Sequence, residues 1–172
     1  MLAVSAYQKY LSIPENYFRD ERWQAANDMA ECLKGTGDYE QAIDACNLAL
    51  SIDGRRAETY CLLGNIFFML QNYENAINCY KQAASTPVPE DVILFLTPKS
   101  YNEIPKDQLV LCYYKTKQYA EAEKLSDEIK GTSTRLLNNL WWVRMKTKQR
   151  IFFVLGKTPE PVWGGMIEQQ GV

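Results

Sequence analysis

The feature of this sequence that most constrains its fold is a self-similarity at an offset of 34 residues within the stretch 23–84. When Trp23 is laid on Ala57, the apolar positions of the two copies coincide, and at most of them small residues fall on small ones and large residues on large ones. A fixed repeat of this length is typical of helical solenoids, in which each unit buries its apolar face against its neighbours. The pattern therefore predicts an all-α fold of stacked helix-turn-helix units. The other coinciding pairs are Met29 with Leu63, Ala30 with Gly64, Leu33 with Phe67, Tyr39 with Tyr73, Ala42 with Ala76, Ile43 with Ile77, Cys46 with Tyr80 and Ala49 with Ala83.

Helix boundaries follow from the spacing of apolar residues and from the turn residues between them. A short leading helix is expected before Pro14, packed on the first repeat, because proline disfavours helix at the residue before it. Gly37 suits the left-handed end of the next helix, and Asp38 is expected to cap the one after it. One-sided apolar patterns predict helices over about 20–35, 39–52, 57–70 and 73–85.

A third copy of the repeat arrives late, because Tyr119 follows Tyr73 by 46 residues instead of 34. The difference predicts an insertion of 12 residues, which lies within 86–101 and contains three prolines. We expect it to be extended or irregular rather than helical, and to serve either as a structural strap or as a lip over a binding groove. The copy is marked by Leu109, Val110, Tyr113, Tyr119, Ala122 and Ile129. The predicted repeats thus occupy about 23–56, 57–90 and 103–132.

Two further segments follow the repeats. A helix over 133–148 is expected to cover the last apolar face of the solenoid, so that the helical domain spans 1–149. Residues 150–172 differ, because the continuous apolar run 151–155 before Gly156 is typical of a strand buried on both faces. Since this strand-like tail has no sheet to join, we expect the natural chain to continue beyond Val172.

Composition excludes several functions. The sequence has no histidine, which removes histidine-based acid–base catalysis, serine or cysteine triads and the common zinc sites. Its acidic residues are expected on polar helix faces, so we predict no catalytic, cofactor-binding or metal-binding residue. The net charge of −2 gives no reason to expect nucleic acid. Five cysteines, none in a Cys-x-x-Cys arrangement, predict reduced thiols. With no signal peptide or membrane span in the sequence, we expect a cytoplasmic protein.

The order of large and small residues within each copy resembles the tetratricopeptide repeat. The first copy departs from this pattern at Ala26, where an aromatic residue is expected, and at Gly54, where proline is expected. The resemblance implies a right-handed α-solenoid whose concave face is lined by the first helix of each repeat, and a role in binding other proteins. The second copy matches best, through Tyr60, Leu63, Gly64, Phe67, Tyr73, Ala76, Tyr80 and Ala83.

Counting along the first helices predicts which residues of the concave face contact a partner. Repeats that clamp a peptide carboxylate share a set of lysines and asparagines, and here Glu31 and Cys61 stand where asparagine and lysine are wanted. An extended peptide or a neighbouring domain resting on Phe68 and Tyr114 is therefore expected instead, and an oligomer is possible. The predicted partner-binding residues are Asn27, Glu31, Asn65, Phe68, Met69, Leu111 and Tyr114.

The tail 150–172 resembles the first strand and loop of glycosyltransferases with two Rossmann-like lobes. The repeats with their proline-rich insertion also resemble the tetratricopeptide region attached to some of these enzymes. The resemblance implies a non-catalytic module of a larger glycosyltransferase polypeptide, acting as spacer, acceptor-positioning arm or assembly surface. The alternative is a self-contained adaptor or assembly protein that binds a peptide or a partner subunit through its concave face.

Overall fold

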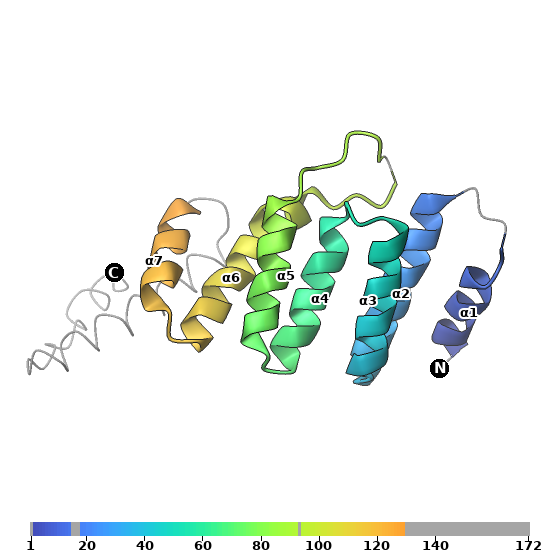
Figure 1. The fold of residues 1–172 in the computed structure, drawn as a ribbon, viewed down its shortest axis with the longest axis horizontal. Coiled ribbons are helices and arrows are strands. Elements are labelled where there is room, and N and C mark those ends of the chain that lie inside the picture. Colours follow the sequence, from blue (N-terminus) through green and yellow to red (C-terminus); the bar gives the residue numbers. More distant parts are fainter. Residues whose placement is uncertain (1, 15–17, 93, 130–172) are drawn as a thin grey trace, which may run out of the picture.

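The computed structural model describes residues 2–14, 18–92 and 94–129, and this part of the chain is helical without any strand, which confirms the expected all-α fold (Figure 1). The predicted helix 133–148 and tail 150–172 lie outside the described residues. In order, the elements are α1 (Leu2–Leu11), α2 (Arg19–Thr36), α3 (Tyr39–Ile52), α4 (Ala57–Met69), α5 (Tyr73–Ser85), the 3-10 helix η1 (Pro98–Tyr101), α6 (Glu103–Lys115) and α7 (Tyr119–Glu128).

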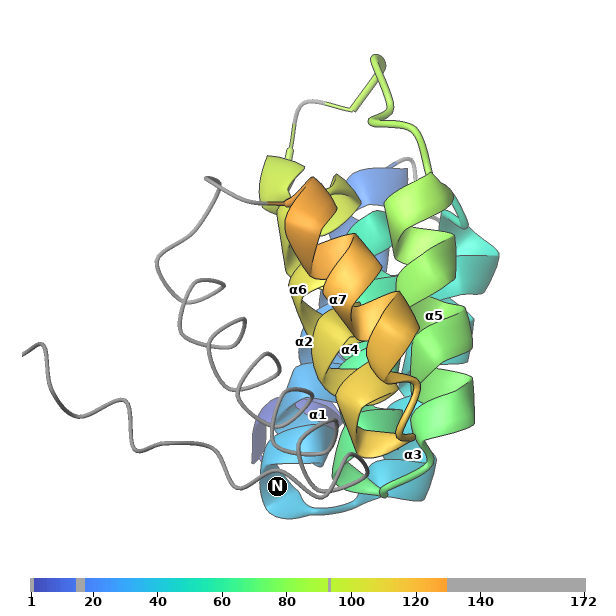
Figure 2. The same cartoon turned by 90° about the vertical axis from the view of Figure 1, so that its left-hand side faces the viewer.

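The helices pair as the repeats predict, α2 with α3, α4 with α5 and α6 with α7, and form an α-solenoid. Figure 2 shows α2, α4 and α6 on one side of the molecule and α3 and α5 on the other. Successive first helices also touch, α2 with α4 and α4 with α6. As expected, α1 packs against α2 at the N-terminal end. We refer below to the face formed by α2, α4 and α6 as the first-helix face.

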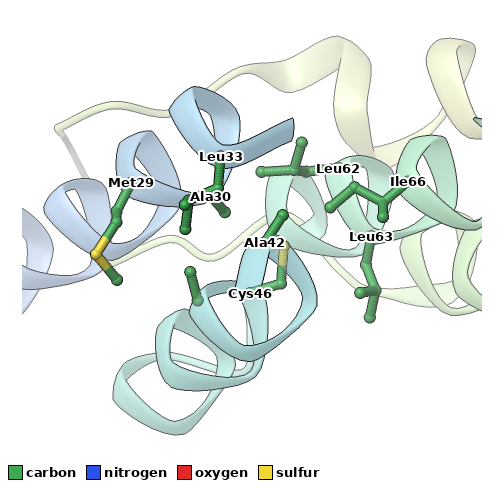
Figure 3. Close-up of a cluster of buried hydrophobic side chains, with 9 residues drawn as sticks. Met29, Ala30, Leu33, Ala42, Cys46, Leu62, Leu63 and Ile66 are labelled. Carbon is green, nitrogen blue, oxygen red and sulfur yellow. The ribbon is translucent and has the colours of Figure 1, made fainter. Parts of the chain in front are cut away.

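The core at the junction of the first two repeats is built by three helices (Figure 3). One face of α2 and one face of α3 meet one face of α4, and every side chain in the cluster is less than a tenth exposed. Burial of this apolar surface is the main force that stacks one repeat on the next. The cluster comprises Met29, Ala30, Leu33, Ala42, Ala45, Cys46, Leu62, Leu63 and Ile66.

At one register position on the first helix and one on the second, the residue sizes vary in opposite directions from repeat to repeat. An ideal Cβ placed on Gly64 would lie 2.6 Å from the Tyr80 ring, so only glycine leaves room for that ring. At the same two register positions, the first repeat has Ala30 with Cys46, and the third has Val110 with Ser126. A larger residue on one helix therefore accompanies a smaller one on the other, which keeps the interior close-packed.

The turn between the two helices of each repeat places one residue in the left-handed region. Gly37 has φ of 86°, and the residues at the same register, Gln71 and Lys117, have φ of 60° and 65°. The expected left-handed end at Gly37 is confirmed. The prediction that Asp38 caps the next helix is wrong. Asp38 occupies the position before α3, but its side chain makes no capping hydrogen bond. Its carboxylate instead accepts a hydrogen bond from the Thr36 hydroxyl at 2.7 Å.

Replacing Gln71 by glycine is expected to stabilise the protein by about 1 kcal/mol, because glycine adopts a positive φ without the steric cost that other residues bear. Equilibrium urea denaturation followed by circular dichroism measures this change. The reverse substitution, Gly37→Gln, is the matched control and should destabilise by a similar amount. Equal stability of both variants and the parent would contradict the argument.

Candidate functional site

A pocket of about 240 Å³ opens on the first-helix face, between α2, α4 and the insertion. Its walls combine amides, carboxylates and apolar side chains. The lining residues are Trp23, Gln24, Asn27, Glu31, Glu58, Cys61, Leu62, Asn65, Phe95, Thr97, Ser100 and Ile104.

Most of the helical lining comes from three register positions of the repeat. Gln24, Glu58 and Ile104 occupy one of them, since the second copy follows the first by 34 residues and the third follows the second by 46. The other two positions supply Asn27 with Cys61 and Glu31 with Asn65. Equivalent positions on parallel first helices point the same way, so the repeat itself builds this wall of the pocket.

Two asparagine amides in the pocket are held in fixed orientations. The Trp23 indole N–H donates to the Thr59 hydroxyl at 2.9 Å, and that hydroxyl donates to Asn27 Oδ1 at 3.0 Å. The Tyr80 hydroxyl donates to Asn65 Oδ1 at 2.7 Å. Because both amide oxygens already accept a hydrogen bond, each amide has its NH₂ group to offer to a ligand.

The insertion forms the opposite wall and is fastened on both sides of Phe95. Arg56 donates to the Leu94 carbonyl at 3.1 Å, and the Glu58 carboxylate accepts from the Thr97 backbone N–H at 2.7 Å. Phe95 lies between these two anchors with φ of 59°, a conformation that costs an aromatic residue energy. Its side chain is 47% exposed and borders the pocket. The described residues 86–92 and 94–97 of the insertion form no helix or strand, as expected, whereas its last four residues form the 3-10 helix η1, which was not expected.

Arg56 joins the insertion to the repeats and is fully buried. Its guanidinium lies 4.3 Å from the centre of the Trp23 ring, a cation–π contact. Nη2 lies 2.9 Å from Asp20 Oδ1 and Nε lies 3.5 Å from Asp53 Oδ2. Neither of these two nitrogens makes an aligned hydrogen bond, so charge attraction and the ring contact hold this part of the group.

A second arginine continues the network to the surface. Arg55 pairs with the buried Asp53 at 3.0 Å and with the exposed Asp91 of the insertion at 2.8 Å. Burial alone would raise the pKa of Asp53, but hydrogen bonds from Arg55, with the charges of Arg55 and Arg19, outweigh it and hold this pKa below its usual value. The hydrogen bond from Arg55 likewise lowers the pKa of Asp91. Both carboxylates therefore stay ionised at neutral pH and tie the insertion to the α3–α4 turn.

The thiol in the pocket is not an activated nucleophile. Cys61 donates to the Ser100 carbonyl at 3.4 Å, and burial, with the nearby Glu58 carboxylate, raises the pKa of its thiol to about 12. The thiol is therefore neutral near pH 7 and weakly reactive. All five cysteines are free thiols. Among the described residues, no group of side chains has the composition and spacing of a metal site.

The structure separates the predicted partner-binding residues into two groups. Asn27, Glu31 and Asn65 come together in the pocket. Phe68 and Tyr114 instead pack edge-on against Tyr73 and Tyr119, with ring centres 5.4 and 5.7 Å apart. Met69 is exposed at the end of α4, and Leu111 is partly buried on α6. For all seven residues, contact with a partner stays a prediction.

Sequence reasoning missed part of the pocket. The repeat could have predicted three of the missed residues, because Gln24, Glu58 and Ile104 share one register position on the three first helices. Phe95 and Thr97 belong to the insertion, which has no counterpart in the other repeats. Their place in the wall follows only from the anchoring contacts of Arg56 and Glu58.

A second, wider hollow of about 400 Å³ lies between the α3–α4 turn, the end of α5 and the insertion. Its walls include Gly54, Arg55, Gln82, Pro89 and Asp91. Two of its charged side chains, Arg55 and Asp91, are already paired with each other across it. We therefore take the pocket on the first-helix face as the candidate site.

Comparison with known proteins agrees with this architecture. Residues 21–86 match the family model described as tetratricopeptide repeat. A search of curated proteins finds no match to the sequence. Within the described residues, no helix combines the length and apolar character needed to cross a bilayer.

Solved structures with the same fold include the following three, each of low sequence identity to this chain. The Sgt2 TPR domain from Aspergillus fumigatus is 16% identical with a TM-score of 0.63, over 80% of this chain and 85% of that one. The second TPR domain of human RPAP3, in complex with an HSP70 peptide, is 15% identical with a TM-score of 0.60, over 74% and 98%. The Yersinia enterocolitica secretion chaperone SycD, in complex with a peptide of the translocator YopD, is 19% identical with a TM-score of 0.58, over 77% and 99%. The described residues thus share the fold of tetratricopeptide-repeat solenoids.

Proposed function

We propose that this chain is a non-catalytic interaction module that binds an extended segment of a partner protein in the pocket on its first-helix face. The observation that carries the proposal is the pair of asparagine amides whose oxygens are fixed by Thr59 and Tyr80. An extended peptide presents unpaired backbone carbonyls, and an amide NH₂ held in place binds such a carbonyl at low entropic cost. The peptide complexes of RPAP3 and SycD support this use of the fold.

Replacing Asn65 by alanine is expected to weaken peptide binding about tenfold, because two hydrogen-bond donors to the ligand are lost. The probe is a library of random twelve-residue peptides selected on the immobilised protein, followed by fluorescence anisotropy of the enriched peptides. Asn78→Ala, on the exposed face of α5, is the matched control and should leave Kd unchanged. Circular dichroism checks that both variants are folded.

Two outcomes would contradict the proposal. One is a selection that enriches no binding sequence at all. The other is an enriched peptide whose Kd is the same for the parent and for folded Asn65→Ala, since such a peptide binds elsewhere.

The wider setting is a proposal of a different kind. We propose that the module belongs to a larger glycosyltransferase polypeptide, in which the bound segment positions an acceptor or a neighbouring domain. The support is the resemblance of residues 150–172, which lie outside the described part of the chain. Sequencing the natural reading frame past Val172 tests it. A continuation without a nucleotide-binding fold would contradict the glycosyltransferase proposal and favour the alternative, a self-contained adaptor protein. The five free thiols favour a reducing compartment such as the cytoplasm for either form.

A further inference from the structure

We infer that the pocket selects a basic side chain, lysine or arginine, of the bound peptide, held by the carboxylates of Glu31 and Glu58 and by the ring of Phe95. This inference rests on the proposed function and adds the chemical class of the ligand. Twelve residues line the pocket; two of them are carboxylates and none is a lysine or arginine. A peptide carboxylate would meet like charge there, whereas a cation meets complementary charge.

Glu58 supplies a carboxylate that is fixed by two neutral hydrogen-bond donors. It accepts hydrogen bonds from the Thr97 backbone N–H at 2.7 Å and from the Tyr101 hydroxyl at 2.9 Å. Both donors are neutral, and no lysine or arginine of the described residues forms an ion pair with it. A carboxylate has about four acceptor positions, so the two hydrogen bonds fix Glu58 and leave it able to accept from a ligand.

Arg56, which lies next to the pocket in sequence and space, does not cancel this charge. Its guanidinium is fully buried beneath Trp23 and faces two carboxylates of its own, Asp20 and Asp53. The positive charge of Arg56 is therefore compensated by Asp20 and Asp53, and the charge of Glu58 remains for a ligand.

Glu31 adds a second carboxylate, which is shared with Lys34 one helical turn away. This pair is a surface one, with the Glu31 side chain 48% exposed, and such pairs contribute little to stability. Phe95 completes the site from the insertion. An aromatic ring at the edge of an acidic pocket attracts a cation and packs against the alkyl part of a lysine or arginine side chain.

The experiment compares the parent with Glu58→Gln and Glu31→Gln, using the random twelve-residue library as probe. Glutamine keeps the shape of glutamate and can still accept from Thr97, so the fold of the insertion should be retained. Glu74→Gln, on the exposed face of α5, removes the same charge outside the pocket and is the matched control. For each enriched peptide with a basic residue, a second peptide carries glutamine in place of that residue.

We expect the parent to enrich peptides with lysine or arginine at one fixed position, and each pocket variant to bind them about fivefold more weakly. Peptides with glutamine at that position should bind the parent and Glu58→Gln equally. The inference is overturned if the enriched peptides carry no basic position, or if Glu58→Gln weakens both peptides of a pair alike. In those cases binding that still depends on Asn65 would leave the proposed function standing, whereas loss of that dependence would remove both.

Discussion

Replacing Arg56 by methionine is expected to lower the free energy of unfolding by about 3 kcal/mol, although methionine is of similar length and apolar. The substitution leaves the buried Asp53 facing the interior with one cationic partner fewer, and it removes the donor to the Leu94 carbonyl. It also uncovers one face of the Trp23 ring. Guanidinium denaturation followed by circular dichroism measures the loss.

Arg55→Met provides the matched control for this prediction. Arg55 is adjacent in sequence and pairs with the same Asp53, but its side chain is 44% exposed. Its removal should cost at most about 1 kcal/mol, because exposed ion pairs are screened by solvent. An equal loss of stability in the two variants would contradict the argument that burial makes the Arg56 charge contribute more to the free energy of unfolding than the Arg55 charge.

The repeat explains how much of the architecture could be predicted from sequence. The same apolar pattern occurs in both of the first two repeats, so each copy supports the helices predicted in the other. The observed ends of α3 and α5 fall where the pattern places them. The turn at Gly37 was predictable because glycine favours a positive φ. Gln71 and Lys117 adopt the same conformation without being glycine, so the repeated turn, and not the residue type, imposes it.

The pocket was only partly predictable, for two physical reasons. Phe68 and Tyr114 lie on first helices, but an aromatic residue at the start of the following helix draws each ring toward its own repeat. The insertion wall could not be predicted, because contacts of Arg56 and Glu58 with backbone groups place it. A backbone group carries no sequence signal, so such anchors become visible only in three dimensions.

Replacing Gly64 by alanine is expected to destabilise the protein by about 2 kcal/mol, although alanine is the better helix former by about 1 kcal/mol. The added methyl group would stand 2.6 Å from the Tyr80 ring. That ring is fully buried, and its hydroxyl is tied to Asn65 at 2.7 Å, so it has little freedom to move away.

The first repeat shows how the same position tolerates alanine. Ala30 is fully buried there, and its partner in the register is the smaller Cys46. In a Tyr80→Cys background, Gly64→Ala should therefore stabilise by about 1 kcal/mol, since the clash is gone and the helix preference remains. A double-mutant cycle by urea denaturation measures the coupling, which should be about 3 kcal/mol. Additive effects of the two substitutions would mean that the exchange of volume between the helices does not determine which residues each repeat can carry.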